Sequence, residues 1–320
     1  MDESRFGRAA FDPELRAALA VVGGVFPPTV TRELIPFMRR SYASPPRAEL
    51  FAGRRVDVED IEIPRADAVL GASIVRPDAG CSGAGILLLH SGGMMFGDRF
   101  SGADQALRWV EQLGAVLVAV DYRLAPEYPD PVPFEDCYAT LEWFAAEAPR
   151  LGVRHDRILV AGASAGGGLA AAVALAARDR GGPRLCGQLL DYPMLDDRGQ
   201  TASMRAFDGV GVWDRISNET GWRALLGDRV GGPDVSAYAA PARATDLHGL
   251  PPAFIDVGSA EVFRDEAVDY AQRLWKAGVD AELHVWPGAF HACDVFAAHT
   301  TIARAMIRAR DDWLRRLLAD

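Results

Sequence analysis

Six short apolar runs recur between residues 86 and 286, and most of them are separated by segments with helical character. Each run is rich in Val, Ile, Leu and Ala, which is typical of strands buried on both faces of a sheet. Alternation of such strands with helical segments indicates a parallel sheet with crossover helices, and therefore an α/β fold. The runs are 86–90, 116–120, 158–161, 188–191, 253–257 and 283–286.

Two further runs precede the parallel set. Residues 56–63 alternate apolar and acidic side chains, and residues 69–75 follow after a short polar turn, so we expect an antiparallel pair. With this pair, the mostly parallel central sheet has about eight strands flanked by helices. The expected helices span 102–113, 134–147, 165–180, 264–277 and 294–318.

The chain divides into a core and two segments that we expect to cover it. Residues 1–50 hold two helical patterns followed by proline pairs, and they either pack on the core as an arm or form part of a lid. About sixty residues separate the runs at 188–191 and 253–257, far more than a crossover needs, and they carry apolar bulk at Phe207 and Trp213. We expect N-terminal cap helices (1–50), a core in two parts (51–194 and 251–320) and an inserted cap segment (195–250).

The composition narrows the range of partners. A chain of 320 residues with 49% hydrophobic side chains can bury a large core, while its net charge of −10 disfavours nucleic acid and anionic membranes as partners. Residues 1–5 lack the apolar core of a secretory signal and no run reaches the length of a membrane span, so we expect a soluble cytoplasmic protein. The four cysteines are scattered, which favours reduced thiols over disulfides or a zinc site.

A Gly-Ala-Ser-Ala-Gly pentad at 162–166 lies between the run at 158–161 and a helical segment. A G-x-S-x-G turn from strand to helix is the geometry of a nucleophile elbow, because glycines remove the Cβ atoms that would collide where the chain reverses. The N-terminus of the following helix directs N–H groups toward developing negative charge. We therefore expect Ser164 to be a nucleophile.

A serine hydroxyl needs a histidine to take its proton and a carboxylate to orient that histidine. Of the six histidines, His291 follows the last strand on a loop at the same sheet edge as the pentad, so we assign it as the base. His284 lies inside that strand and is expected to be packed or exposed. The positions of His155, His248 and His299 indicate no particular role.

The loop after the run at 253–257 supplies the candidate acid. Glu261 lies closest to the strand end, where its side chain can reach a histidine on the next loop, so we assign it this role. Asp265 and Glu266 fit the first turn of a helix, where acidic residues complement the helix dipole, and Asp256 lies within the strand. The chain order Ser, acid, His is the one expected for an α/β-hydrolase.

A glycine pair after the run at 86–90 predicts an oxyanion hole. Consecutive glycines let N–H groups approach a substrate oxygen closely, so we assign those of Gly92 and Gly93, with that of Ala165, as donors. An ordinary glycine-rich turn is the alternative, and His90 is expected to order this loop. The candidate pocket residues are Met94, Met95, Phe96, Phe207 and Trp213, with core packing as the alternative for the first three.

These motifs together resemble the hormone-sensitive-lipase-like α/β-hydrolases, the bacterial acetyl-esterase group. The resemblance implies hydrolysis of small-molecule carboxylic esters, usually with short acyl chains, under a cap and without a metal or organic cofactor. It also implies that two copies can pair through the last strand and helix. The matching motifs are His-Ser-Gly-Gly (90–93), Asp-Tyr-Arg-Leu-Ala-Pro-Glu (121–127), the pentad with Gly167, Asp-Tyr-Pro-Met-Leu (191–195), and segments within 246–252, 263–266 and 277–279.

The chain departs from that family at three positions around one site. Ser91 replaces the first glycine of an HGGG motif, Ala163 stands where Asp or Thr is common, and Glu261 stands where Asp is usual. An amidase, lactonase or deacetylase using the same residues is an alternative function, because the triad acts on a carbonyl and the cap selects the rest. A non-catalytic small-molecule receptor of this fold is another alternative, against which the presence of His291 argues.

Overall fold

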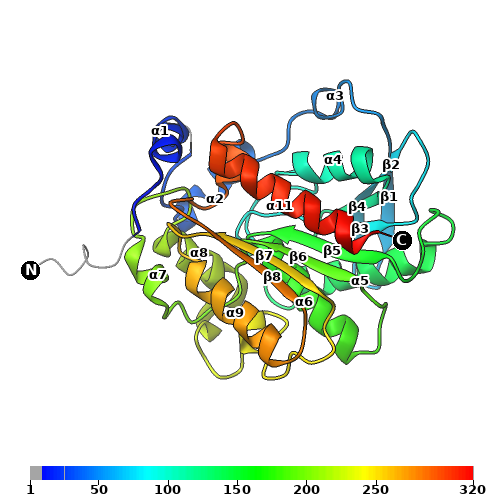
Figure 1. Ribbon diagram of the computed structural model, residues 1–320. Helices are drawn as coiled ribbons and strands as arrows, with labels where there is room; N and C mark the ends of the chain where they lie inside the picture. Colours follow the sequence, from blue (N-terminus) through cyan, green and yellow to red (C-terminus); the bar gives the residue numbers. More distant parts are fainter. Residues whose placement is uncertain (1–8, 25, 320) are drawn as a thin grey trace, which may run out of the picture.

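The structure is a computed structural model that describes residues 9–24 and 26–319. Within these residues, eight strands form one sheet in the order β1-β2-β4-β3-β5-β6-β7-β8 (Figure 1). Strand β2 is antiparallel to β1 and β4, and all other neighbours are parallel. The strands are β1 (Val56–Pro64), β2 (Val69–Pro77), β3 (Gly85–Leu89), β4 (Val116–Val120), β5 (Ile158–Ala163), β6 (Gly187–Asp191), β7 (Ala253–Gly258) and β8 (Ala281–Trp286).

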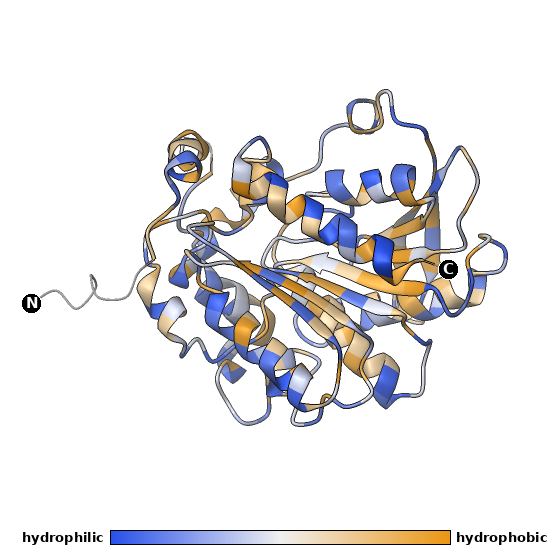
Figure 2. Ribbon diagram, viewed as in Figure 1, coloured by the Kyte–Doolittle hydropathy of each residue, from blue (hydrophilic) through white to orange (hydrophobic). Residues whose placement is uncertain are grey.

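Helices cover both faces of this sheet, which confirms the predicted α/β architecture. Helices α4 and α11 lie on one face, and α5, α6 and α9 lie on the other (Figure 1). Side chains alternate along each strand, so Ile86 and Leu159 pack toward the first pair of helices while Leu87 and Val160 pack toward the others. Figure 2 shows the resulting apolar strands between helices with hydrophilic outer faces. The helices are α4 (Asp104–Leu113), α5 (Val132–Glu147), α6 (Ala165–Asp179), α9 (Arg264–Lys276) and α11 (Thr301–Leu317).

The prediction of one final helix over 294–318 is wrong, because the segment forms α10 (Cys293–Phe296) and α11. Ala297 leaves the helical region with φ −139° and ψ 39°, and Thr300 is extended. The hydroxyl of Thr300 donates to the Ala297 carbonyl at 2.8 Å, while the N–H of Thr301 donates to the Glu14 carboxylate at 2.8 Å. These bonds replace helical hydrogen bonds across the break.

Two segments outside the core meet at the carboxyl edge of the sheet. The Thr29 hydroxyl donates to Asp214 at 2.6 Å, and the Val30 N–H donates to the Ser217 hydroxyl at 2.8 Å, so the N-terminal segment binds the insertion. Their helices are α1 (Pro13–Val22), α2 (Ile35–Ser41) and α3 (Arg47–Leu50) in the first, and α7 (Ala202–Ala206) and α8 (Arg215–Leu226) in the second.

Part of the predicted N-terminal cap, residues 1–8 and 25, lies outside the described residues, as do the residues 1–5 on which the cytoplasmic expectation rests. Throughout 9–24 and 26–319, no helix combines the length and the apolar character needed to cross a membrane.

Close backbone contact joins the ends of β3 and β5. An ideal Cβ atom at Gly166 would lie 2.0 Å from the Leu89 carbonyl oxygen and 2.6 Å from that of His90. At Gly162, a Cβ atom would lie 2.2 Å from the Gly166 carbonyl oxygen. The start of α6 is therefore pressed against the loop that leaves β3, which only glycine permits.

Replacing Gly166 with alanine should destabilise the fold by about 1–3 kcal/mol or more, because the added methyl group must displace the backbone of β3. The midpoint of urea-induced unfolding measures this change. Gly23→Ala is the control, since Gly23 has φ −61° and its Cβ atom would lie 3.3 Å from the Leu19 carbonyl oxygen. Equal midpoints for the two variants would contradict the close contact.

Candidate active site

Ser164 sits at the turn from β5 to α6 in a strained backbone conformation, with φ 57° and ψ −119°. Its N–H donates to the Asp191 carbonyl at 2.8 Å, and its own carbonyl accepts from Met194 at 2.9 Å and Gly168 at 3.0 Å. Such a conformation costs about 1–3 kcal/mol for a residue other than glycine, and persists where neighbouring bonds impose it. These bonds hold the predicted nucleophile at the carboxyl edge of the sheet.

His291 lies within hydrogen-bond distance of both predicted partners. Its Nε2 atom is 3.1 Å from Ser164 Oγ, and its Nδ1 atom is 2.6 Å from Glu261 Oε2. With an ionised Glu261, Nδ1 carries the proton and Nε2 accepts from the serine hydroxyl. His291 and Glu261 are 5% and 2% exposed, so these bonds are shielded from water. The structure therefore brings the three residues together in the order that proton transfer from the serine requires.

Two loops fix the positions of Glu261 and His291. The Gly258 N–H donates to Glu261 Oε1 at 2.9 Å, so one carboxylate oxygen binds the end of β7 while the other binds the histidine. A Cβ atom at Gly258 would lie 2.1 Å from the Ala289 carbonyl oxygen, which in turn accepts from Ala260 at 3.1 Å. This contact brings the loops after β7 and β8 together, and the longer glutamate side chain fits between them.

The other carboxylates near this loop are engaged elsewhere. Asp256 forms an ion pair with Arg310 at 3.0 Å, and Asp265 accepts from the Ser203 N–H at 2.7 Å. Glu266 is buried, which raises the pKa of its carboxyl group well above the usual range, and it accepts a backbone hydrogen bond. Of these four carboxylates, Glu261 is the one that bonds to His291, the candidate base.

The predicted oxyanion loop has the backbone that its glycines allow. Gly92 and Gly93 have φ values of 121° and 59°, and a Cβ atom at Gly92 would lie 1.9 Å from the Phe96 carbonyl oxygen. Among the described residues, neither N–H donates to a protein acceptor. Ala165, the third predicted donor, is the first residue of α6. The N–H groups of both glycines remain available to a substrate oxygen.

His90 orders this loop through its ring. The imidazole stacks on Tyr122 with a centroid distance of 4.1 Å, and its Nδ1–H donates to the Ser91 carbonyl at 2.7 Å. Burial lowers the pKa of His90, which favours the neutral ring. Its contacts agree with the predicted ordering role.

Ser91 connects the oxyanion loop to the N-terminal segment. Its hydroxyl lies 2.6 Å from the Tyr42 hydroxyl, and the Tyr42 ring packs edge-on against Phe96 at 5.5 Å. Ser91 lies outside the left-handed backbone region, so a side chain is tolerated where the related motif has glycine. The substitution adds a hydrogen bond just before the two glycine donors.

A narrow cavity of about 30 Å³ opens at Ser164 and His291. Phe96 and Trp213 line it as expected, and the Trp213 ring lies so close to Gly93 that a Cβ atom there would be 2.3 Å from it. The remaining lining residues are Phe26, Tyr42, Ser91, Gly92, Tyr192, Val212, Ala292 and Phe296.

The expectation that Met94, Met95 and Phe207 line this pocket is corrected. All three are at most 1% exposed and belong to the main hydrophobic core, and none is among the described residues around the cavity. The Met94 carbonyl accepts from the Ala125 N–H at 2.9 Å, which ties this part of the loop to the chain after β4. Core packing, the alternative reading, therefore holds for the two methionines.

Among the pocket residues that the sequence analysis missed, Tyr192 is the one whose position carries a signal. Tyr192 follows a strand end, and its ring contacts the edge of His291 at 4.8 Å. Phe26, Tyr42 and Phe296 come from segments far apart in the chain and meet only in the folded protein.

Comparison with known proteins supplies the family. A family model described as the alpha/beta hydrolase fold matches residues 86–295, which is more than half of the chain. The chain belongs to the α/β-hydrolase family. This confirms the resemblance and the fold class that the sequence predicts.

Named relatives of this α/β-hydrolase are ester hydrolases. Esterase LipI of Mycobacterium tuberculosis is 37% identical over 201 residues, which are 62% of each protein. Carboxylesterase NlhH of the same species is 38% identical over 218 residues, covering 66% of this chain and 67% of NlhH. The solved structure of a bacterial heroin esterase superimposes with a TM-score of 0.89 at 36% identity, covering 97% of this chain and 99% of that one. The aligned relatives thus agree with the predicted class of enzyme.

The pair of hydroxyls at Tyr42 and Ser91 should contribute to turnover by holding the oxyanion loop. Tyr42→Phe and Ser91→Gly should each lower kcat on a nitrophenyl ester about fivefold, with KM nearly unchanged, because one hydrogen bond is worth ~1 kcal/mol. Since both variants remove the same bond, the double variant should lose no more than either single variant.

Tyr128→Phe on the exposed loop after β4 is the matched control and should keep full activity. Losses that multiply in the double variant would show that the two hydroxyls act independently.

Proposed function

We propose that this α/β-hydrolase is a serine carboxylesterase that hydrolyses short-chain carboxylic esters. The observation that carries the proposal is the pair of hydrogen-bond distances from His291, 3.1 Å to Ser164 and 2.6 Å to Glu261. A nucleophile, a base and an orienting acid in this geometry support acyl transfer. The three relatives described above are named esterases or carboxylesterases, which supports an ester as the substrate.

The first half of the proposed reaction forms an acyl-enzyme. Ser164 Oγ attacks the carbonyl carbon while its proton passes to His291 Nε2, and Glu261 stabilises the imidazolium. The N–H groups of Gly92, Gly93 and Ala165 bind the oxygen that becomes negatively charged. When the carbon–oxygen bond to the alcohol breaks, His291 returns the proton to the leaving oxygen.

The second half releases the acid. Water loses a proton to His291 and attacks the acyl carbon, the same three N–H groups bind the oxyanion, and the serine recovers its proton. We propose that neither half uses a metal or an organic cofactor, since every proton and charge has a partner among these side chains and N–H groups.

The shape of the cavity favours a small acyl group. Its volume is only about 30 Å³, and aromatic rings from Phe26, Tyr42, Phe96 and Trp213 surround it. We propose that segments 1–50 and 195–250 form the cap, because they supply most of these rings and bind each other. Short acyl chains on apolar alcohols suit such a pocket.

A cytoplasmic location and a homodimer also belong to the proposal. All four cysteines are unpaired, which agrees with a reducing compartment. In the described sheet, β8 is the last strand and carries Val285, which is 41% exposed, so a second copy has an edge to bind.

Ser164→Ala should lower the rate of nitrophenyl acetate hydrolysis by about 10⁴-fold or more, because the covalent route is lost. The rate of nitrophenol release by the purified protein measures this loss. An organophosphonate should label the wild-type protein at Ser164. Ser82→Ala, at an exposed serine, is the control and should keep both activity and labelling. Wild-type turnover by Ser164→Ala would remove the proposed nucleophile.

Glu261→Gln should lower kcat about 10²- to 10⁴-fold, since the neutral amide no longer stabilises the imidazolium. Asp265→Asn is the matched control, because Asp265 binds the Ser203 N–H and lies outside the bonds to His291. We expect this control to stay within about tenfold of wild type. If Asp265→Asn were the more damaging change, the role of the acid would pass to that residue.

A further inference from the structure

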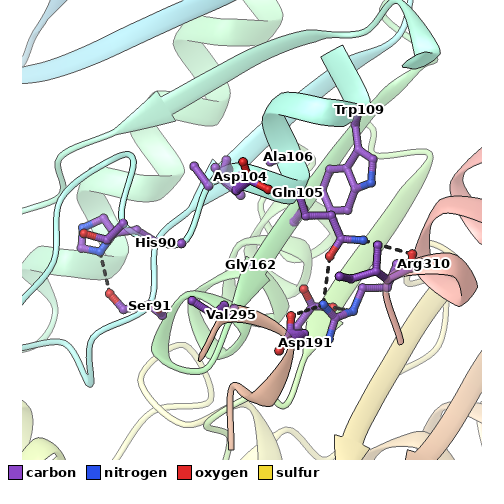
Figure 3. Close-up of a pocket in the computed structure, with 18 of the residues that line it drawn as sticks. His90, Ser91, Asp104, Gln105, Ala106, Trp109, Gly162, Asp191, Val295 and Arg310 are labelled. Atoms are coloured by element: carbon purple, nitrogen blue, oxygen red, sulfur yellow. Dashed lines mark hydrogen bonds and ion pairs between the residues drawn. The ribbon is translucent and has the colours of Figure 1, made fainter. Parts of the chain in front are cut away.

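A second cavity, of about 220 Å³, lies under the elbow on the face covered by α4 and α11. The exposed residues that line it are Gly102, Asp104 and Ala298, which we take as its mouth. Its inner end holds Asp294 together with Asp191 and Arg310, which lie side by side in Figure 3. Ala163, the residue before the candidate nucleophile, also lines it. Ser91 and Tyr192 separate it from the cavity at Ser164, because they line both.

The inner end has three carboxyl groups around one guanidinium. Arg310 is fully buried and lies 2.9 Å from Asp191, 3.0 Å from Asp256 and 2.5 Å from Asp294. Burial raises the pKa of both Asp191 and Asp256, which favours their protonated form where no further cation pairs with them. Buried carboxylates are costly unless each is paired, so this cluster favours a further cation.

Two carboxylate oxygens at this end have no hydrogen-bond donor among the described residues. Asp294, whose side chain is 6% exposed, has an unpartnered Oδ1, while its Oδ2 accepts from Arg310. Asp191 Oδ1 lies 2.9 Å from Arg310 Nε in an ion pair but accepts no hydrogen bond, because that N–H is directed at Asp256 Oδ2 at 3.1 Å. Three of the four other guanidinium N–H groups donate to Gln105, Asp294 and Asp256. A ligand here must therefore supply donors.

The walls decide which kind of cation fits. Among residues 9–24 and 26–319, no group of three or more His, Cys, Asp or Glu side chains could hold a metal ion. Between the charged end and the mouth, apolar side chains line the cavity together with polar ones that include Ser101, Gln105 and Arg108, and Val295 is 41% exposed. An ion with three N–H donors and a short hydrocarbon chain matches both surfaces. The apolar lining includes Leu89, Ala106, Trp109, Val295 and Ile307.

We propose that this cavity binds a primary alkylammonium ion, with its ammonium group on Asp294 and Asp191 and its alkyl chain along the wall between α4 and α11. Binding adds a second cation to the Arg310 cluster and gives Asp294 Oδ1 a donor, while Asp191 Oδ1, already paired with Arg310, gains a hydrogen bond. The site is separate from Ser164, so the proposal does not depend on ester hydrolysis.

Calorimetric titration of the whole protein with n-butylammonium chloride tests the proposal. We expect saturable binding of one ion per chain, with no saturable binding of n-butanol, which has the same alkyl chain without the charge. Equal binding of both ligands, or none of either, would overturn the proposal; a cavity filled by water alone gives the latter result.

Two variants locate the bound ion. Asp294→Asn should weaken n-butylammonium binding about tenfold or more, because it removes the negative charge of the carboxylate whose Oδ1 has no donor. Ala298→Trp, at the exposed mouth, should abolish binding by filling the entrance. If circular dichroism shows that Asp294→Asn is unfolded, this second variant provides the test. Asp269→Asn on α9, on the opposite face, is the control and should bind as wild type does. Unchanged binding in Ala298→Trp would place the ion elsewhere and refute the proposal.

Discussion

A single buried guanidinium joins the chain segments that carry the candidate triad. Arg310 reaches from α11 to Asp191, Asp256 and Asp294, which belong to β6, β7 and α10. The carbonyl of Asp191 accepts from the nucleophile, β7 leads into the loop of the acid, and α10 follows the loop of the base. Because charge attraction is strong where water is excluded, these contacts fix three loops relative to one helix. The geometry at His291 depends on that bracing.

Much of the fold was predictable because strands buried on both faces leave a plain signal. Every predicted strand is present, with its ends shifted by no more than two residues. Short, continuous apolar runs that alternate with helical segments are typical of buried parallel strands. The residues that meet at His291 were also predictable, because parallel strands place the loops after β5, β7 and β8 at one edge. Glu261 was distinguished from Asp265 by its shorter distance from the strand end and by the place of Asp265 in the first turn of a helix.

The rest depends on contacts between distant parts of the chain. Helical spacing places Arg310 on the same face of α11 as the buried Met306 and Trp313, but its carboxylate partners lie on other elements, and the break before Thr301 depends on a bond to Glu14. The rings of Phe26 and Phe296 come together only when the N-terminal segment reaches α10. Local sequence patterns do not predict such contacts between distant segments, because tertiary packing determines them.

The contact between Trp213 and Gly93 has a consequence for how such an enzyme diversifies. The indole belongs to the insertion and the glycine to the oxyanion loop, and no atom lies between them. Exchange of that one ring for a smaller side chain would deepen the pocket while every strand keeps its register. Single substitutions in the covering segments can therefore change which substrates fit, while the central sheet keeps its structure and stability.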